Sequence, residues 1–199
     1  GKAATWNNQS GDRQWNISSS VNWDQVEYNY TYQNGIDVTF GNTGAGAVTL
    51  DGSLSPKSVT VNNSSGYNYI WQGSGNLSGS MKLTKKGAGI LTVNTINHYT
   101  GGTAISGGTV VLGANNALGT GAVTLSNATL NMGGKITPNN LTLSGSSKIL
   151  NGTNYRGNFT MNGNLLAGSS ISIISGKTAT LKKGNVGGSI SGAGNTVIN

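Results

Sequence analysis

The sequence lacks cysteine, contains two prolines and is poor in charged residues, which make up 9% of its 199 residues. A typical soluble domain has about a quarter charged residues. The absence of cysteine excludes a disulfide framework and a zinc site of the usual kind. Scarce proline and the absence of a strict Gly-x-y period exclude collagen, despite 33 glycines. No run approaches the ~20 apolar residues of a membrane span, so we expect no direct membrane span.

Carboxylates are confined to the first 51 residues, which have a net charge of −3. Residues 52–199 contain ten basic residues and no acid, and their charge of +10 brings the whole chain to +7. A body with this charge is expected to attract polyanions.

Short apolar-Thr-apolar triplets recur between turns rich in Gly, Asn and Ser. Each triplet points two residues to one face and Thr to the other, which is typical of a half-buried strand. Glycine interrupts almost every ten-residue window and disfavours helices. The triplets begin at Val38, Val48, Val59, Leu91, Val123, Leu141 and Phe159.

Strands at this spacing could form an antiparallel β-sandwich or a solenoid, and internal sequence repeats favour the solenoid. Self-similarity at such intervals indicates coils that stack on their neighbours, here built from short strands and Gly/Asn corners. Segment 46–50 returns at 121–125, segment 55–61 at 137–143, and segment 76–79 at 189–192. We therefore predict an all-β solenoid over residues 37–199.

Residues 1–36 differ from this body, because they contain three of the four tryptophans and the alternating Tyr28, Tyr30 and Tyr32. The open end of a solenoid needs cover for its edge and core. We interpret residues 1–36 as an aromatic-rich N-terminal cap with short strands of its own. Residues 194–199 remain in the solenoid pattern, so we expect the chain to be truncated at its C-terminal end.

Residues 83–112 resemble the autotransporter-associated β-strand repeat, and the likeness extends to residue 125. The pattern is Leu-x-Lys-x-Gly-x-Gly-x-Leu-x-apolar, then Asn-x-Tyr-x-Gly-x-Thr-x-Ile-x-x-Gly. The matching residues are Leu83, Lys85, Gly87, Gly89, Leu91, Val93, Asn97, Tyr99, Gly101, Thr103, Ile105 and Gly108.

This resemblance implies a right-handed parallel β-helix in the passenger of an autotransporter. It implies a location on the bacterial cell surface or secretion, with export through the outer membrane by a translocating barrel on a missing C-terminal part. It supplies no catalytic residue and no cofactor. Absent cysteine fits such export, because disulfides formed on the way would trap loops.

Candidates for catalysis are few, and we expect no enzyme activity, metal or cofactor. Asp24 and Glu27 are the nearest acid pair, and we interpret them as solvated loop charges. His98 is the single histidine, and it lacks a nearby acid to complete a triad, so we expect a surface turn residue. A carbohydrate-active enzyme or carbohydrate-binding module with its site in residues 1–51 remains an alternative.

The first candidate binding surface is aromatic, because the alternation of Tyr28, Tyr30 and Tyr32 predicts that they lie on one face of a strand. Flat sugar faces stack on aromatic rings, so these side chains could form a glycan platform. The alternative is that the rings plug the end of the solenoid. The candidate residues are Trp15, Trp23, Tyr28, Tyr30 and Tyr32.

The second candidate surface is basic and combines Lys82, Lys85 and Lys86 with Lys182 and Lys183. If the coils align these lysines, they form a stripe for acidic or mucin-type glycans; alternatively they only keep the rod soluble. We expect no nucleic-acid partner, because arginine is scarce and no aromatic alternates with the lysines. The leading hypothesis is thus an adhesin segment with a weakly cationic, glycan-facing surface, and a pure structural spacer is a further alternative.

Overall fold

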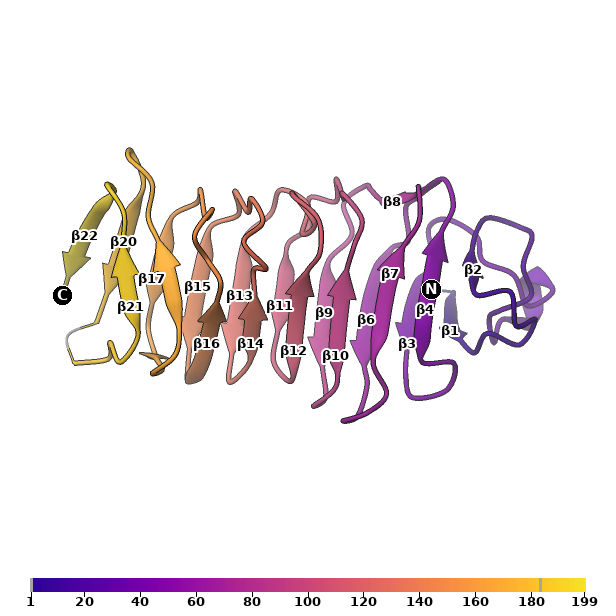
Figure 1. Ribbon diagram of the computed structural model, residues 1–199. Helices are drawn as coiled ribbons and strands as arrows, with labels where there is room; N and C mark the ends of the chain where they lie inside the picture. Colours follow the sequence, from indigo (N-terminus) through magenta and orange to yellow (C-terminus); the bar gives the residue numbers. More distant parts are fainter. Residues whose placement is uncertain (1, 183) are drawn as a thin grey trace.

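The computed structural model describes residues 2–182 and 184–199 as a solenoid of stacked coils (Figure 1). Every ladder between its named strands is parallel. Among the described residues the one helical element is the 3₁₀ turn η1 (Val26–Tyr28). The predicted all-β, parallel β-solenoid is confirmed.

Two long sheets and two small ones make up the solenoid. The ten-stranded sheet contains, in spatial order, β1 (Ala3–Trp6), β3 (Asp37–Phe40), β6 (Ser58–Asn62), β9 (Leu83–Lys86), β11 (Thr103–Ile105), β13 (Val123–Ser126), β15 (Leu141–Ser144), β17 (Phe159–Met161), β20 (Thr178–Leu181) and β22 (Asn195–Ile198). The eight-stranded sheet contains β18 (Asn164–Leu165), β16 (Ser146–Leu150), β14 (Thr129–Asn131), β12 (Thr109–Leu112), β10 (Ile90–Val93), β7 (Tyr69–Gln72), β4 (Gly46–Leu50) and β2 (Gln14–Trp15). The small sheets pair β5 (Ser53–Leu54) with β8 (Asn76–Leu77), and β19 (Ser170–Ser172) with β21 (Ser189–Ser191).

Successive coils stack in a strict register. Leu83 pairs with Thr103, 20 residues on, and Thr103 pairs with Val123 after another 20 residues. The next two coils have 18 residues, from Val123 to Leu141 and on to Phe159. Ten strands at ~4.8 Å give a rod on the order of 40 Å long.

The register lines side chains up in columns, and one outward column of the ten-stranded sheet is almost entirely threonine. Ala104 of β11 occupies the corresponding position between Thr84 and Thr124. Branched residues that alternate with buried apolar ones suit a pleated, half-buried surface. The column contains Thr5, Thr39, Thr60, Thr84, Thr124, Thr142, Thr160 and Thr180.

One predicted echo is not a structural equivalence. Segment 46–50 is strand β4 of the eight-stranded sheet, whereas segment 121–125 leads into β13 of the ten-stranded sheet. The triplet pattern specifies which side chains face inward, and it is compatible with either sheet. The echo between 55–61 and 137–143 does join equivalent strands, since β6 and β15 both belong to the ten-stranded sheet.

The N-terminal part encloses a cluster of aromatic rings. Trp23 packs against Trp6, Trp15 and Tyr32 with ring centroids 5.3–5.6 Å apart, and all four side chains are fully buried. Strands β1 and β2 of this segment already belong to the two long sheets through β3 and β4. The predicted aromatic-rich segment is therefore present, and its role as a cap stays a prediction.

The expectation that Tyr28, Tyr30 and Tyr32 alternate along one strand is wrong. Tyr28 ends η1, and the next two residues, Asn29 and Tyr30, have φ angles of 53° and 62°. Left-handed residues interrupt the period of two on which a strand depends. The turn is closed by a hydrogen bond from the Tyr30 amide to the Gln25 carbonyl, with N and O 2.7 Å apart.

Candidate binding surfaces

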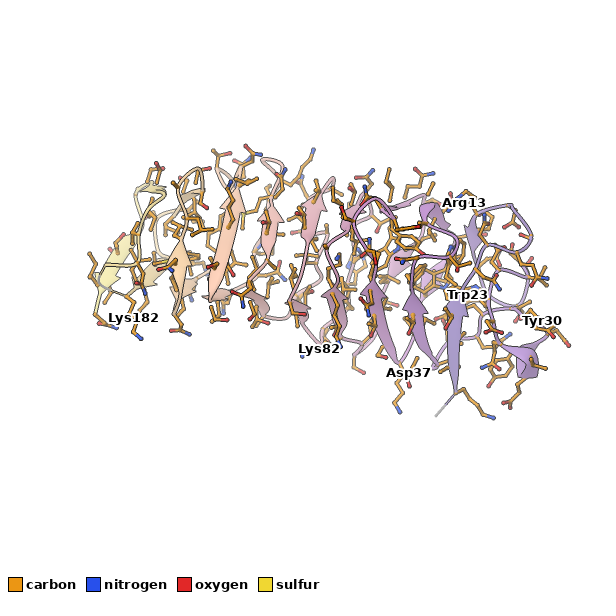
Figure 2. All side chains as sticks on the ribbon, turned by 90° about the horizontal axis from the view of Figure 1, so that it is seen from below. Arg13, Trp23, Tyr30, Asp37, Lys82 and Lys182 are labelled. Atoms are coloured by element: carbon orange, nitrogen blue, oxygen red, sulfur yellow. The ribbon has the colours of Figure 1, made fainter. Side chains whose placement is uncertain are left out.

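Most of the aromatic candidates are core residues. Trp15, Trp23 and Tyr32 have no exposed surface, so burial corrects the prediction that they contact a glycan. Tyr28 is partly buried and packs against the core. Tyr30 is 43% exposed at the N-terminal tip, while Trp23 lies inside (Figure 2).

Lys85 is also buried, with 0% exposure. Its position in β9 faces inward between Val61 and Ile105, in a column that is otherwise apolar. Its Nζ atom donates hydrogen bonds to the backbone carbonyl oxygens of Lys86 (2.6 Å), Gly87 (2.9 Å) and Gly107 (3.4 Å). Burial lowers the pKa of Lys85 to about 8. The prediction that Lys85 belongs to a glycan-binding stripe is therefore corrected by its place in the core.

The remaining lysines do not form one stripe with each other. Lys82 precedes β9 and Lys86 ends it, so the two lie at opposite edges of the ten-stranded sheet. Lys182 follows β20, five ladder steps from β9, near the C-terminal end (Figure 2). Lys183 lies outside the described residues. Lys82, Lys86 and Lys182 are exposed and separate.

Two acids of the N-terminal part, Asp12 and Glu27, have side-chain partners. Glu27 forms an ion pair with Lys2. Desolvation raises the pKa of Asp12, but hydrogen bonds outweigh it, among them those from the Ser20 hydroxyl (2.6 Å) and the Gln14 amide (2.9 Å). Their net effect lowers the pKa of Asp12 to about 2. Asp24 is exposed, as expected of a solvated loop charge.

Asn97 joins three successive coils. Its Oδ1 atom accepts a hydrogen bond from the Leu77 amide (2.9 Å), and its Nδ2 atom donates to the Ala117 carbonyl (2.7 Å). Two residues on, the buried Tyr99 hydroxyl lies 2.7 Å from the Thr103 hydroxyl, and burial raises the pKa of Tyr99. Buried polar groups of this kind are paired because an unpaired one is costly.

Gly101 shows how closely the coils approach. A Cβ atom at this position would lie 2.2 Å from the Met81 carbonyl oxygen. Any side chain would therefore push the two coils apart.

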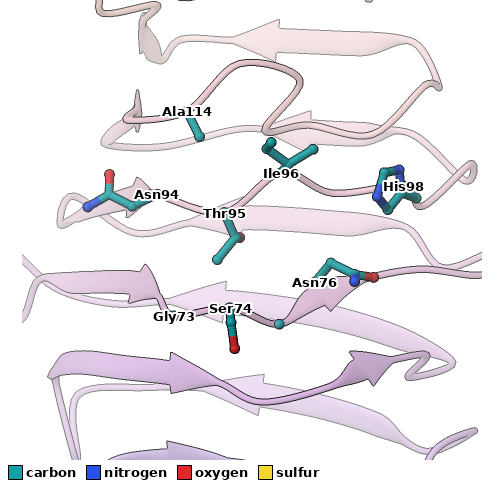
Figure 3. A pocket seen from close by; sticks show the side chains of 9 residues that line it. Gly73, Ser74, Asn76, Asn94, Thr95, Ile96, His98 and Ala114 are labelled. Carbon is teal, nitrogen blue, oxygen red and sulfur yellow. The ribbon is translucent and has the colours of Figure 1, made fainter.

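An open groove lies over the segments that leave β7 and β10, with a volume of about 550 Å³. The neighbouring side chains of Asn76 and His98 mark one end, Asn94 marks the other, and Thr95 and Ile96 lie between them (Figure 3). The full lining is Gly73, Ser74, Gly75, Asn76, Asn94, Thr95, Ile96, His98 and Ala114. Of these, the sequence indicates only His98 as a candidate for chemistry, because polar turn residues carry no periodic signal.

Residues 83–112 match the family of the passenger-associated-transport-repeat. The chain carries an autotransporter passenger repeat. The repeat covers β9 to β12. Its motif residues Asn97 and Gly101 contact neighbouring coils, while Lys85 and Tyr99 are buried and hydrogen-bonded in the core. The contacts of these four residues are those of a scaffold.

One relative is the adhesin BmaC autotransporter of Brucella suis biovar 1 (strain 1330). It is 34% identical over an alignment of 116 residues that covers 46% of this chain and 3% of the relative. The chain therefore spans a small part of that protein. No solved structure matches the chain significantly. Within residues 2–182 and 184–199, no helix is long and apolar enough to cross a membrane.

Proposed function

We propose that the chain is a non-catalytic, adhesive segment of an autotransporter passenger, displayed on the bacterial surface or secreted. The passenger repeat carries this proposal, together with the distant similarity to an adhesin. Lys85, Asn97, Tyr99 and Gly101 of the repeat serve the core and the stacking of coils, which leaves the outer faces available for ligands. The same similarity supports export across the outer membrane by a translocating barrel.

A glycan is the ligand class that we propose for the outer faces. Of the residues predicted from the sequence, Tyr28, Tyr30, Lys82, Lys86 and Lys182 retain exposed or partly exposed side chains. Acidic or mucin-type glycans are the ligands that we propose for the exposed lysines, and each lysine would contact the glycan separately.

The test is binding of the whole chain to immobilised mucin and to a panel of neutral, sialylated and sulfated glycans. Each measurement is made at low and at physiological salt, because exposed charge contacts weaken with salt. We expect selective binding that survives physiological salt. Binding that is absent, or indiscriminate and lost with salt, would overturn the adhesin proposal in favour of a spacer.

A further inference from the structure

The groove between residues 73–76 and 94–98 has the shape and chemistry of a ligand site. We propose that it binds an uncharged, hydroxyl-rich ligand of the neutral oligosaccharide class. This inference rests on the proposed adhesive function and names a site and a ligand class for it.

The groove is large enough for a small ligand and is built by close packing of the chain. Its volume of about 550 Å³ falls within the ~300–1,000 Å³ of small-molecule sites. A Cβ atom on Gly75 would lie 2.7 Å from the Gly52 carbonyl oxygen, so this segment must lie directly against the preceding coil.

The lining can match sugar hydroxyls. The Asn94 amide can both donate and accept hydrogen bonds. The Asn76 Oδ1 atom accepts from the Ser53 hydroxyl (3.3 Å), and its Nδ2 group offers a donor. The Ser74 hydroxyl and the His98 ring add further polar groups. Ile96 is 52% exposed between them, which offers an apolar contact to the carbon face of a sugar ring. A few polar groups around an apolar contact are the usual composition of such sites.

The absence of charge in the lining selects against acidic glycans. No Lys, Arg, Asp or Glu is among the nine described residues around the groove. A sialic acid or sulfate group bound here would give up hydration and gain no countercharge. The groove therefore favours neutral sugars, in contrast to the separate lysines of the ten-stranded sheet.

The wall of the groove is fixed before any ligand binds. Beneath it the Thr95 hydroxyl donates to Asn97 Oδ1 (3.1 Å), and the His98 amide donates to the Leu77 carbonyl (2.8 Å). A site whose groups are already ordered loses less conformational entropy on binding.

His98 is the single histidine of the chain, so its ring NMR signals report directly on the groove. The folded chain is titrated with neutral, sialylated and sulfated oligosaccharides while these signals are followed. We expect neutral oligosaccharides to shift them at lower concentration than their acidic counterparts. Neutral sugars that bind without shifting the His98 signals would overturn the inference.

Substitutions provide the second readout. Asn76→Ala and His98→Ala should each weaken neutral-sugar binding about tenfold, because each removes a hydrogen-bonding group. The matched control is Asn164→Ala, since Asn164 begins the two-residue strand β18 as Asn76 begins β8. Unchanged affinity in both groove variants would overturn the site. Glycan binding that persists in these variants leaves the adhesive function standing, whereas the absence of all glycan binding removes both proposals.

Discussion

Lys85 is a lysine in a column of buried, inward-facing side chains of the ten-stranded sheet. Its stem fills space between apolar neighbours, and its ammonium group caps three carbonyl oxygens near a corner. This arrangement satisfies those carbonyls at the cost of burying a charge. The lysine of the repeat is therefore a structural residue here.

The stability of the protein should depend on pH through Lys85. The folded-state pKa of about 8 lies below the ordinary value of 10.5, so the unfolded chain binds more protons between these values. The free energy of unfolding should therefore rise with pH in this window, by up to about 3 kcal/mol. Urea unfolding from pH 7 to pH 9.5 covers the larger part of this rise, about 2 kcal/mol.

Lys85→Met is the comparison for that measurement, because it keeps the apolar stem and all tyrosines. The rise with pH should be absent in this variant. Lys82→Met, at the exposed position just before the same strand, should retain it. Equal pH dependence in the wild type and in Lys85→Met would show that Lys85 does not titrate in this range.

At the scale of the element, coils are joined by buried polar side chains as well as by strand ladders. The segments that connect the two long sheets have no continuous strand ladder. There the Asn97 side chain takes the place of a backbone partner for the Leu77 amide and the Ala117 carbonyl. The segments that connect the strands thus keep their register through side chains.

Asn97→Ala should lower the free energy of unfolding by about 2–4 kcal/mol, since it leaves a buried amide and a buried carbonyl unpaired. Chemical denaturation measures the loss. His98→Ala, at the exposed neighbouring position, should change stability by less than about 0.5 kcal/mol. A similar small effect for both variants would mean that water replaces the Asn97 bonds.

At the scale of the whole molecule, stability is built from coils that contact their neighbours, as in other solenoids. The coil from Leu141 to Asn158 should therefore be removable. Leu141 pairs with Val123 on one side and with Phe159 on the other. Without this coil, Phe159 could take the place of Leu141 and pair directly with Val123.

Deletion of residues 141–158 should give a folded, shorter solenoid with β-type circular dichroism and cooperative unfolding. Deletion of residues 141–157 should not, because a shift of one residue turns the buried face of a strand outward. Circular dichroism and urea unfolding of the two deletions provide the comparison. Equal stability of both would show that register does not control the stacking.

The sequence by itself determined the inward and outward pattern of the strands, the solenoid class and the repeat at residues 83–112, because these depend on local periodicity and composition. Only the tertiary structure decided which strands share a sheet, as the echo of 46–50 shows. It also decided that Lys85 and Trp15 are buried, since burial depends on what the next coil places opposite them. The groove beside His98 arises from the stacking of coils, and no stretch of sequence contains it alone.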